Sequence, residues 1–513
     1  MKRSNQKGAA LIFAMIFVLV LSIMAASLMF ISQSETWASL NYRLMTQSRY
    51  GAEAGLHAAA NYLMYNYTPA GGIGDPITAY NMTGSPVTYG GSPVALGVTM
   101  NGLSANYPVP SVQTNFSTNT AGTLAAGNTN VNYTVSAELL TMKQFQFCGS
   151  ATGQPLTGQV WQLTSHGDIS AARSSEVEVS ALLELHVTPC FNYAGFATGT
   201  GCASIQFNGG GTIDSYDSGA LTLSNGSPVT QLYDGNLGSN GNLNAAPNTT
   251  VNGTFSSPDT GVGNCSAGAV DALSGNTTAV TGCVTGTTGC GTPIIKLRAT
   301  QTYTPPVTDY PGCTGASAGT CDGTQATALN QTGAGTNINP GNYGDISTAK
   351  ALTLNPSGTA PNCGPGIYYI NSITLHGNGS LGISACKNAD GTLTNPPVYQ
   401  PIIVNIVGAN GATPLDLGGN GLLNNTFNAS LIQINYSGTG GINIHGNGSS
   451  AGVIYAPNAN ITLSGNGTIY GSVIGAQLTA NGNPVNIHYD RSLSNILKQP
   501  GNWTLDTFTW SKY

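Results

Sequence analysis

The chain has 513 residues, of which 69 are glycine, 40% are hydrophobic and only 7% are charged, and its formal net charge at pH 7 is −6. This low net charge excludes a chain kept disordered by charge repulsion, and the absence of a three-residue glycine period excludes collagen. Five of the 14 Lys and Arg residues lie in the first 49 positions, so the remainder cannot build the basic surface that nucleic acid requires.

The N-terminus predicts a membrane-spanning helix. Lys2, Arg3 and Lys7 precede Gly8, and residues 9–31 contain no charge. These 23 residues would extend about 34 Å as a helix, enough to cross a bilayer core. The leading cations favour a cytoplasmic N-terminus and place the rest of the chain outside. A cleavable signal peptide ending near Ser27 is the alternative, but the apolar stretch is longer than a usual signal core.

The helical pattern continues past the apolar stretch. No proline occurs until Pro69, and apolar residues recur at three- and four-residue steps, as expected for one buried stripe. The sequence therefore predicts a single helix from Ala9 to about Tyr65, the first half in a membrane and the second half amphipathic. The stripe comprises Trp37, Leu40, Leu44, Ala52, Leu56, Ala59, Ala60 and Leu63.

This leader and helix resemble the class III signal of type IV pilins, and within them the PilX-type minor pilins. The resemblance rests on GAALIFAMIFVLVLSIM and on NYRLMTQSRYGAEAGLHAA. It implies cleavage by a prepilin peptidase between Gly8 and Ala9, storage in the inner membrane, and assembly with other pilins and the pilus machinery into an extracellular pilus. The residues expected to pack in the filament are Leu11, Ile12, Phe13, Glu53 and Gly55.

One position departs from the pilin pattern. Most major pilins carry Glu at the fifth mature position, and this chain has Phe13 there. The departure favours a priming or tip position over a repeating shaft subunit. A membrane anchor that holds a surface domain unrelated to pili is the alternative.

Residues 68–195 predict a small pilin-like α+β junction. Segments 131–140, 160–164 and 175–187 alternate apolar and polar residues, which is typical of a half-buried antiparallel sheet. From about residue 196 a short apolar alternation followed by a Gly-Asn turn repeats, as in 374–379, 415–421, 442–448 and 461–467. Intervals of about one or two units of 20 residues predict a β-solenoid.

The predicted fold class is therefore mainly β: a long N-terminal helix, a small α+β junction and a large right-handed parallel β-solenoid. We assign residues 1–8 to the leader, 9–67 to the helix, 196–260 and 341–493 to the solenoid, and 494–513 to a C-terminal cap. Residues 261–340 are expected to form a Cys-, Pro- and Gly-rich excursion, or the link between two solenoid halves.

Ten cysteines without CxxC spacing predict disulfides in an oxidising exterior rather than a zinc site. Three pairs would close local loops: Cys283 with Cys290, Cys313 with Cys321, and Cys363 with Cys386. The candidate disulfide cysteines are Cys148, Cys190, Cys202, Cys265, Cys283, Cys290, Cys313, Cys321, Cys363 and Cys386.

Some β-helix proteins are enzymes that act on polysaccharides, so we consider an enzymatic function for the expected solenoid. Asp214 and Asp217 are two carboxylates three residues apart, and His376 and His445 each precede a glycine. A glycosidase needs a carboxylate pair at a fixed separation, and most expected coil faces carry only Asn, Thr and Ser. A regular Asp ladder for calcium is also absent. We therefore expect no enzyme, metal or cofactor, and predict binding of carbohydrate, a host or an abiotic surface.

Overall fold

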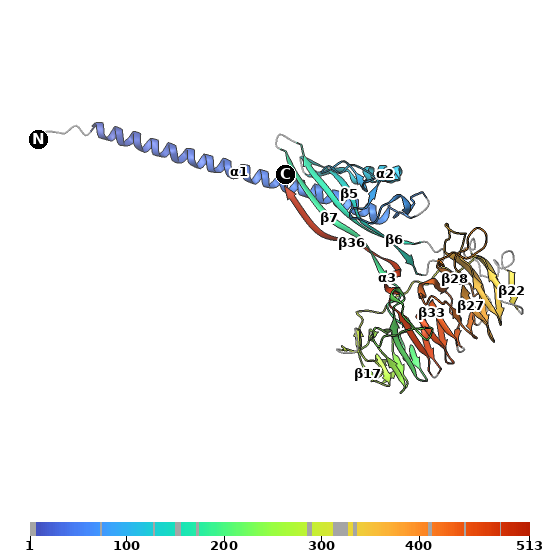
Figure 1. The fold of residues 1–513 in the computed structure, drawn as a ribbon. Coiled ribbons are helices and arrows are strands. Elements are labelled where there is room, and N and C mark those ends of the chain that lie inside the picture. Colours follow the sequence, from blue (N-terminus) through green and yellow to red (C-terminus); the bar gives the residue numbers. More distant parts are fainter. Residues whose placement is uncertain are drawn as a thin grey trace. The chain divides into compact units, whose positions relative to one another are not determined.

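The computed structural model describes the chain except residues 1–6, 72–73, 127–128, 149–154, 171–173, 285–289, 311–326, 332–335, 409–412, 446–447, 483 and 513. It divides into two compact units (Figure 1). The head unit comprises residues 1–144, 157–186 and 501–513, and the solenoid unit comprises residues 145–156 and 187–500. The solenoid is thus an insertion, and the chain passes between the units at residues 144/145, 156/157, 186/187 and 500/501.

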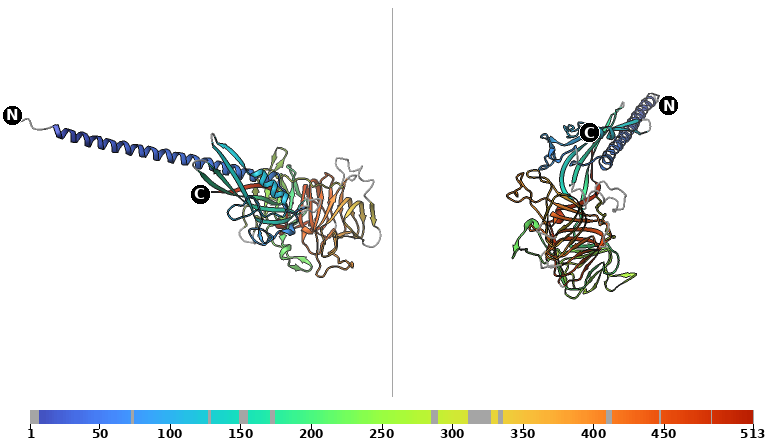
Figure 2. Two further views of the ribbon diagram at one scale, coloured as in Figure 1. Left: turned by 90° about the horizontal axis from the view of Figure 1, so that it is seen from above. Right: turned by 90° about the vertical axis from the view of Figure 1, so that its right-hand side faces the viewer.

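One helix dominates the head unit. Helix α1 runs from Lys7 to Tyr65, 59 residues without a break, which corresponds to about 88 Å. Its first half extends away from the strands of the head, and its second half packs on them (Figures 1 and 2). Leu44, Ala52, Leu56 and Leu63 are buried, whereas Trp37 is 56% exposed. The predicted helix and most of its apolar stripe are therefore confirmed.

The head sheet packs its apolar face against α1. Strand β6 alternates between half-buried and buried residues along its whole length, because successive side chains of a strand point to opposite faces. Trp161, Leu163, Val177 and Val179 form its core with the helix. Besides α1, the described head elements are η1 (Ile77–Ala79), β1 (Thr88–Tyr89), β2 (Ser92–Pro93), β3 (Ala95–Gly97), α2 (Pro110–Thr120), β4 (Gly122–Ala126), β5 (Thr129–Phe147), β6 (Leu156–Ile169), β7 (Ser175–Pro189) and β36 (Leu497–Lys512).

Strand β36 corrects the predicted C-terminal cap. Residues 494–513 were expected to close one end of the solenoid, but β36 is hydrogen-bonded beside β7 in the head sheet. The Ser180 and Thr509 hydroxyls lie 2.9 Å apart within it. The sequence WTLDTFTWSKY alternates as any half-buried strand does, so its pattern carries no information about which sheet it joins.

The solenoid unit consists of parallel strands stacked in three sheets. Sheet 1 contains, in spatial order, parts of β24 (Gly341–Thr348), β26 (Gly366–Leu375), β28 (Ile402–Ile406), β31 (Ile432–Tyr436), β33 (Ser449–Leu463), β34 (Thr468–Ala480), β8 (Gly195–Ala197), β13 (Leu237–Ser239), β16 (Phe255–Ser257) and β21 (Ile294–Lys296).

Sheet 2 contains the second halves of the longer strands and the next short ones. Its members are β22 (Thr327–Gln331), β24, β26, β29 (Leu415–Leu417), β32 (Ile442–Ile444), β33, β34, β9 (Ile205–Phe207), β14 (Leu243–Ala245), β20 (Leu273–Gly275) and β17 (Val262–Gly263).

Sheet 3 completes each coil. It contains β23 (Thr336–Ile338), β25 (Ala351–Leu354), β27 (Ser380–Ile383), β30 (Leu422–Leu423), the beginnings of β33 and β34, β35 (Asn486–Asp490), β10 (Gly211–Tyr216) and β15 (Thr249–Val251). The inward apolar side chains of the three sheets form one continuous core.

The spatial order of the coils differs from their order in the sequence. The last coil stacks on the first, because Val473 of β34 is paired with Gly195 of β8 and Leu478 with Ile205 of β9. The two predicted solenoid segments therefore form one stack, which the chain enters and leaves in its interior. Strands β20 and β21 continue that stack, so residues 273–275 and 294–296 belong to coils and not to the expected excursion.

Residues 297–310 run between the two solenoid segments, which agrees with the predicted alternative that part of 261–340 links two solenoid halves. Asn240 Nδ2 donates to Gln301 O at 2.8 Å, Tyr455 Oη donates to Thr304 O at 2.8 Å, and Tyr310 Oη donates to Tyr343 O at 2.7 Å. These partners follow one another from the early coils to the late ones. We call residues 297–310 the strap, because they run across sheet 1.

Glycines form the corners where coils press together. A Cβ on Gly482 would lie 1.9 Å from Gly465 O, and one on Gly379 would lie 2.5 Å from Thr348 O. Gly377, Gly419 and Gly465 also have positive φ, a backbone conformation that favours glycine. The repeated Gly-Asn turns are thus explained by close stacking.

Four disulfides join described cysteines of the solenoid unit: Cys148–Cys190, Cys202–Cys265, Cys283–Cys290 and Cys363–Cys386. The predicted local pairs 283–290 and 363–386 are therefore present. The predicted pair of Cys313 with Cys321 lies outside the described residues.

Candidate functional site: the exposed helix and the polar solenoid face

The first half of α1 presents a large apolar surface. Leu11, Ile12 and Phe13 are 65%, 60% and 71% exposed. The hydroxyl of Ser22 donates to Val18 O at 2.7 Å, so it needs no partner outside the helix. Within the described residues, α1 is the one helix long and apolar enough to cross a membrane. Burying each large apolar side chain would contribute about 1.5–3 kcal/mol, so this surface favours lipid or other apolar helices.

Two glycines bring the second half of α1 close to the head sheet. A Cβ on Gly55 would lie 2.4 Å from Ser165 Oγ and 2.8 Å from Tyr133 Cδ2. On the strand side, a Cβ on Gly167 would lie 2.0 Å from Ser48 O and 2.5 Å from Ala52 N. The structure thus gives Gly55 a packing role inside the subunit. Its predicted role in the filament stays a prediction.

Glu53 lies one turn from an arginine. Its Oε1 accepts a hydrogen bond from Arg49 Nε at 2.8 Å, with the Glu53 side chain 24% exposed. The Glu53 carboxylate is therefore partly exposed while it is paired, and its predicted role in the filament stays a prediction. Gly8 and Ala9 lie in the first turn of α1, Lys7 is its first described residue, and Lys2 and Arg3 lie outside the described residues.

Residues 7–57 match the PilX N-terminal family. The match coincides with the exposed apolar half of α1 and its first contacts with the head, and it confirms the resemblance found in the sequence. The match and the apolar helix together fit a membrane-anchored, pilin-like N-terminal segment.

Two further comparisons found a similarity. Residues 402–496 match a domain of unknown function, DUF7305, which spans the solenoid from β28 to helix α3 (Leu493–Ile496). A solved structure, the competence-associated pilin ComZ from Thermus thermophilus, aligns over 92% of this chain and 98% of its own at 12% identity, with a TM-score of 0.28. No curated protein matches the chain.

Beyond the PilX segment, sheet 2 of the solenoid carries a continuous row of outward polar side chains. Each member lies between two buried residues, and all members except Ser347 are the centre of an apolar-polar-apolar triplet such as Ile461-Thr462-Leu463. Successive members are direct partners in neighbouring strands. We define the polar row as Ser347, Thr374, Asp416, Asn443, Thr462, Thr479, Gln206 and Asn244, in spatial order.

The two carboxylates considered as a catalytic pair bind different partners. Asp214 is 3% exposed and its carboxylate is bonded to His488 Nδ1. Asp217 accepts a hydrogen bond from Gly219 N at 2.9 Å and lies 3.8 Å from Arg491 Nη2. Asp217 and Arg491 line a cavity of about 640 Å³, together with Asp234. The two carboxylates thus have separate partners.

The two candidate histidines differ from one another. His445 Nε2 lies 2.5 Å from Asp416 Oδ1 at the surface of sheet 2, and His376 is exposed. Each sits one position beyond a strand, at a solenoid corner. No cluster of three metal-ligating side chains occurs among the described residues.

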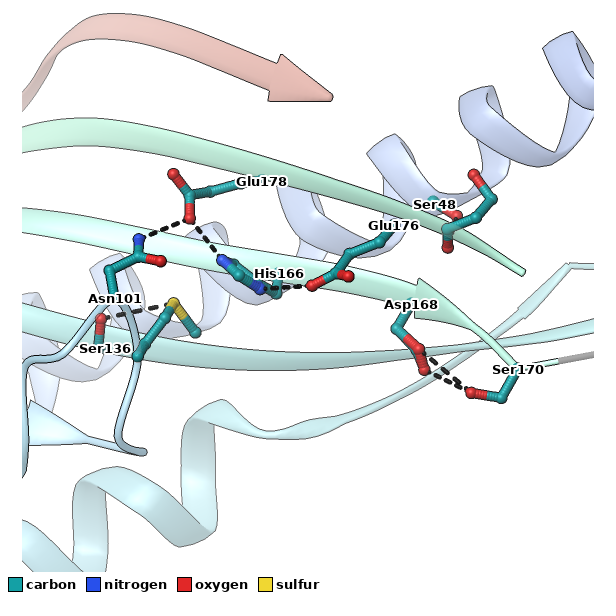
Figure 3. Close-up of polar contacts among 10 residues, drawn as sticks. Ser48, Asn101, Ser136, His166, Asp168, Ser170, Glu176 and Glu178 are labelled. Carbon is teal, nitrogen blue, oxygen red and sulfur yellow. Dashed lines mark hydrogen bonds and ion pairs between the residues drawn. The ribbon is translucent and has the colours of Figure 1, made fainter. Parts of the chain in front are cut away.

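The head sheet carries a charged cluster that sequence reasoning missed (Figure 3). His166 Nδ1 lies 2.9 Å from Glu176 Oε1 and His166 Nε2 lies 2.5 Å from Glu178 Oε2. Asn101 Nδ2 also donates to Glu178 at 2.7 Å. His166 and Glu178 are direct cross-strand partners in β6 and β7. The apolar-polar alternation of both strands predicts that His166, Glu176 and Glu178 lie on the outer face of the sheet. It does not predict the register of β6 against β7, which brings these side chains together.

A buried polar network in the head was also missed. Tyr80 Oη and Tyr107 Oη each donate to Asp75 at 2.7 Å, and Tyr107 Oη lies 3.1 Å from Tyr67 Oη. Burial raises the pKa of Tyr67 to about 12 and raises those of Tyr80 and Tyr107 as well. Asp75 lies in the GIGDP segment, whose loop character hides this role.

Proposed function

We propose that this chain is a minor-pilin-like component of a type IV pilus that assembles into or primes the filament and displays an adhesive solenoid outside the cell. The observation that carries the proposal is the PilX N-terminal match over the exposed apolar half of α1. A helix that is apolar on all sides needs a lipid or helical environment throughout its length, and a pilin provides first one and then the other.

Processing is the first step of the proposed function. Prepilin peptidase cuts between Gly8 and Ala9, and Lys2, Arg3 and Lys7 orient the leader in the cytoplasm. The mature chain then leaves the inner membrane when residues 9–31 exchange lipid for the helices of other pilins. Phe13 replaces the charged residue of major pilins, which supports a priming or tip position.

The test is mass spectrometry of the N-terminal peptide from sheared surface filaments. A chain that begins at Ala9 is expected, and Gly8→Asp should abolish both cleavage and recovery in filaments, whereas Gln6→Ala should leave both unchanged. A chain that begins at Met1 in the membrane fraction, or near Ser27 in the medium, would contradict the proposal.

The solenoid unit acts, in this proposal, by binding and without chemistry. Its support is that Asp214 and Asp217 engage separate partners within the chain. Incubation of the full chain with a panel of polysaccharides should release no product. Release of product that is lost in Asp217→Asn would replace this part of the proposal with an enzyme.

A further inference from the structure

Most side chains of the polar row leave their hydrogen-bonding groups unused within the described residues; the exceptions include Gln206, which donates to Asn208, and Asp416, which is bonded to His445. Its members are half-buried at their bases, so their backbones are fixed while their polar ends face outward. The side chains of Thr374, Asn443, Thr462 and Thr479 make no hydrogen bond to any other described residue. Strand spacing is about 4.8 Å, so eight members extend about 34 Å along the solenoid.

The row continues across the junction between the two chain segments. Thr479 of the last coil is the direct partner of Gln206 of the first, and Gln206 is the partner of Asn244. Beside the row, Asn208 Nδ2 donates to Asn481 Oδ1 at 2.7 Å across the same junction, although the two residues are 273 positions apart in sequence. The polar surface is therefore as regular at the junction as elsewhere.

The other two sheets offer no equivalent surface. In sheet 1 every residue of β28 and β31 is buried, and the strap crosses this sheet. In sheet 3 the outward row contains Gly382 and the 41% exposed Leu423, which interrupt its polar groups. Sheet 2 alone among the described strands presents hydrogen-bonding side chains on eight successive coils.

The charge of the row restricts its partner. It contains no Lys or Arg, and its single charge, Asp416, is paired with His445. Polymers with strong negative or positive charge therefore find no complementary group. Hydroxyl and amide groups, which both donate and accept, match the hydroxyl groups of sugars. A polymer that binds many such groups weakly gains affinity by multivalency along the row.

We propose that the polar row binds an extended, uncharged polysaccharide whose sugar units lie along the solenoid axis, one near each coil. This inference rests on the proposed adhesive role of the solenoid and adds the surface and the ligand class. An extended β-linked sugar unit is close in length to the strand spacing, so successive units can meet successive coils.

The test uses the full chain in detergent and insoluble cellulose and chitin as probes, with alginate beads as the anionic comparison. Strand β34 offers a matched pair of variants, because Thr479 belongs to the polar row and Thr468 to sheet 3, and both are half-buried. Thr479→Arg should weaken binding to the neutral polymer at least tenfold, whereas Thr468→Arg should leave it unchanged.

Isosteric variants exclude misfolding as the cause. Thr462→Val with Thr479→Val keeps side-chain shape and strand preference but removes two hydroxyls, and about tenfold weaker binding is expected. Thermal unfolding and circular dichroism should match those of the parent chain. Equal losses in Thr468→Val, or preference for alginate, would overturn the inference.

The outcomes separate this inference from the proposed function. A chain that begins at Ala9 in filaments but binds neither neutral polymer would sink the inference and leave the pilin role intact. A chain that binds cellulose or chitin through Thr479 but retains its leader would support the inference about the polar row and contradict the proposed pilin role.

Discussion

The head sheet and the solenoid differ in where they place charged side chains. In the antiparallel strands β6 and β7, His166 faces Glu178, and its two ring nitrogens are bonded to Glu176 and Glu178. In the parallel coils, each position of the polar row meets the same position of the next coil, and seven of its eight members are uncharged. Direct repetition brings like groups together, so a solenoid must avoid charge where an antiparallel sheet can pair it.

The largest expected effect lies at the helix of the head. Gly167→Val would place side-chain atoms on the backbone of Ser48 and Ala52, where neither can move without displacing α1. We expect a loss of at least about 3 kcal/mol in the free energy of unfolding of the head, measured by chemical denaturation.

A matched control exists in the same unit. A Cβ added to Gly84 would meet only one atom, Pro86 O at 4.0 Å, so Gly84→Ala should change stability by less than about 0.5 kcal/mol. A Gly167→Val head as stable as the parent would show that α1 and β6 are not in close contact.

Alkaline pH should destabilise the head through its tyrosine network. The pKa of Tyr67 is about 12 when folded and about 10 when unfolded. The folded state therefore holds this proton more tightly, and the associated stability is complete below pH 10 and is lost between pH 10 and about 12. The expected loss is about 2–3 kcal/mol, measured by denaturation at each pH.

Tyr67→Phe provides the control for this prediction. It removes the titrating group, so the stability of the head should fall less steeply over the same interval. An identical slope in parent and variant would assign the alkaline loss to other groups.

Charged substitutions in the polar row should lower the free energy of unfolding by less than the changes in the head described above. Thr462→Asp with Thr479→Asp places two carboxylates on direct partners in the ladder, and repulsion should lower the unfolding free energy by about 1–2 kcal/mol. Thr462→Asp with Thr479→Lys should recover most of that loss. Thermal unfolding at low and high salt would measure it, and no difference between the two variants would contradict the contrast between the units.

The smallest expected effect concerns Glu53. Its ion pair with Arg49 is an exposed contact between residues four apart, so Glu53→Gln should lower stability by about 0.3 kcal/mol. If Glu53 also packs in the filament, recovery of the chain in sheared filaments should fall well beyond that small change. Unchanged recovery would remove Glu53 from the predicted packing residues.

The sequence predicted the features that local periodicity encodes. The helix expected from Ala9 runs from Lys7 to Tyr65, and the strands around 131–140, 160–164 and 175–187 lie in β5, β6 and β7. The Gly-Asn turns identified coils because a corner glycine is required wherever two backbones touch.

The local sequence pattern could not predict which strands pair with one another. Nothing in Leu478 or Ile205 distinguishes a strand that stacks on its sequence neighbour from one that stacks on the first coil of the unit. The same holds for β36, whose alternation fits either unit, and for Asp75, which binds two tyrosines only after the loop is folded. Disulfides between distant cysteines, such as Cys202 and Cys265, depend on the same long-range order.

The chain enters and leaves the solenoid in the interior of the stack, and this arrangement affects how the number of coils can vary. The first coil strand, β8, and the last, β35, both lie inside the stack, so neither outer end of the solenoid holds the strand at which its coils begin or finish in the sequence. A coil can be duplicated or deleted beyond β21 or β24 without altering either of these strands. The length of the solenoid is therefore adjustable by insertion at two sites, while helix α1 and the head sheet are left untouched.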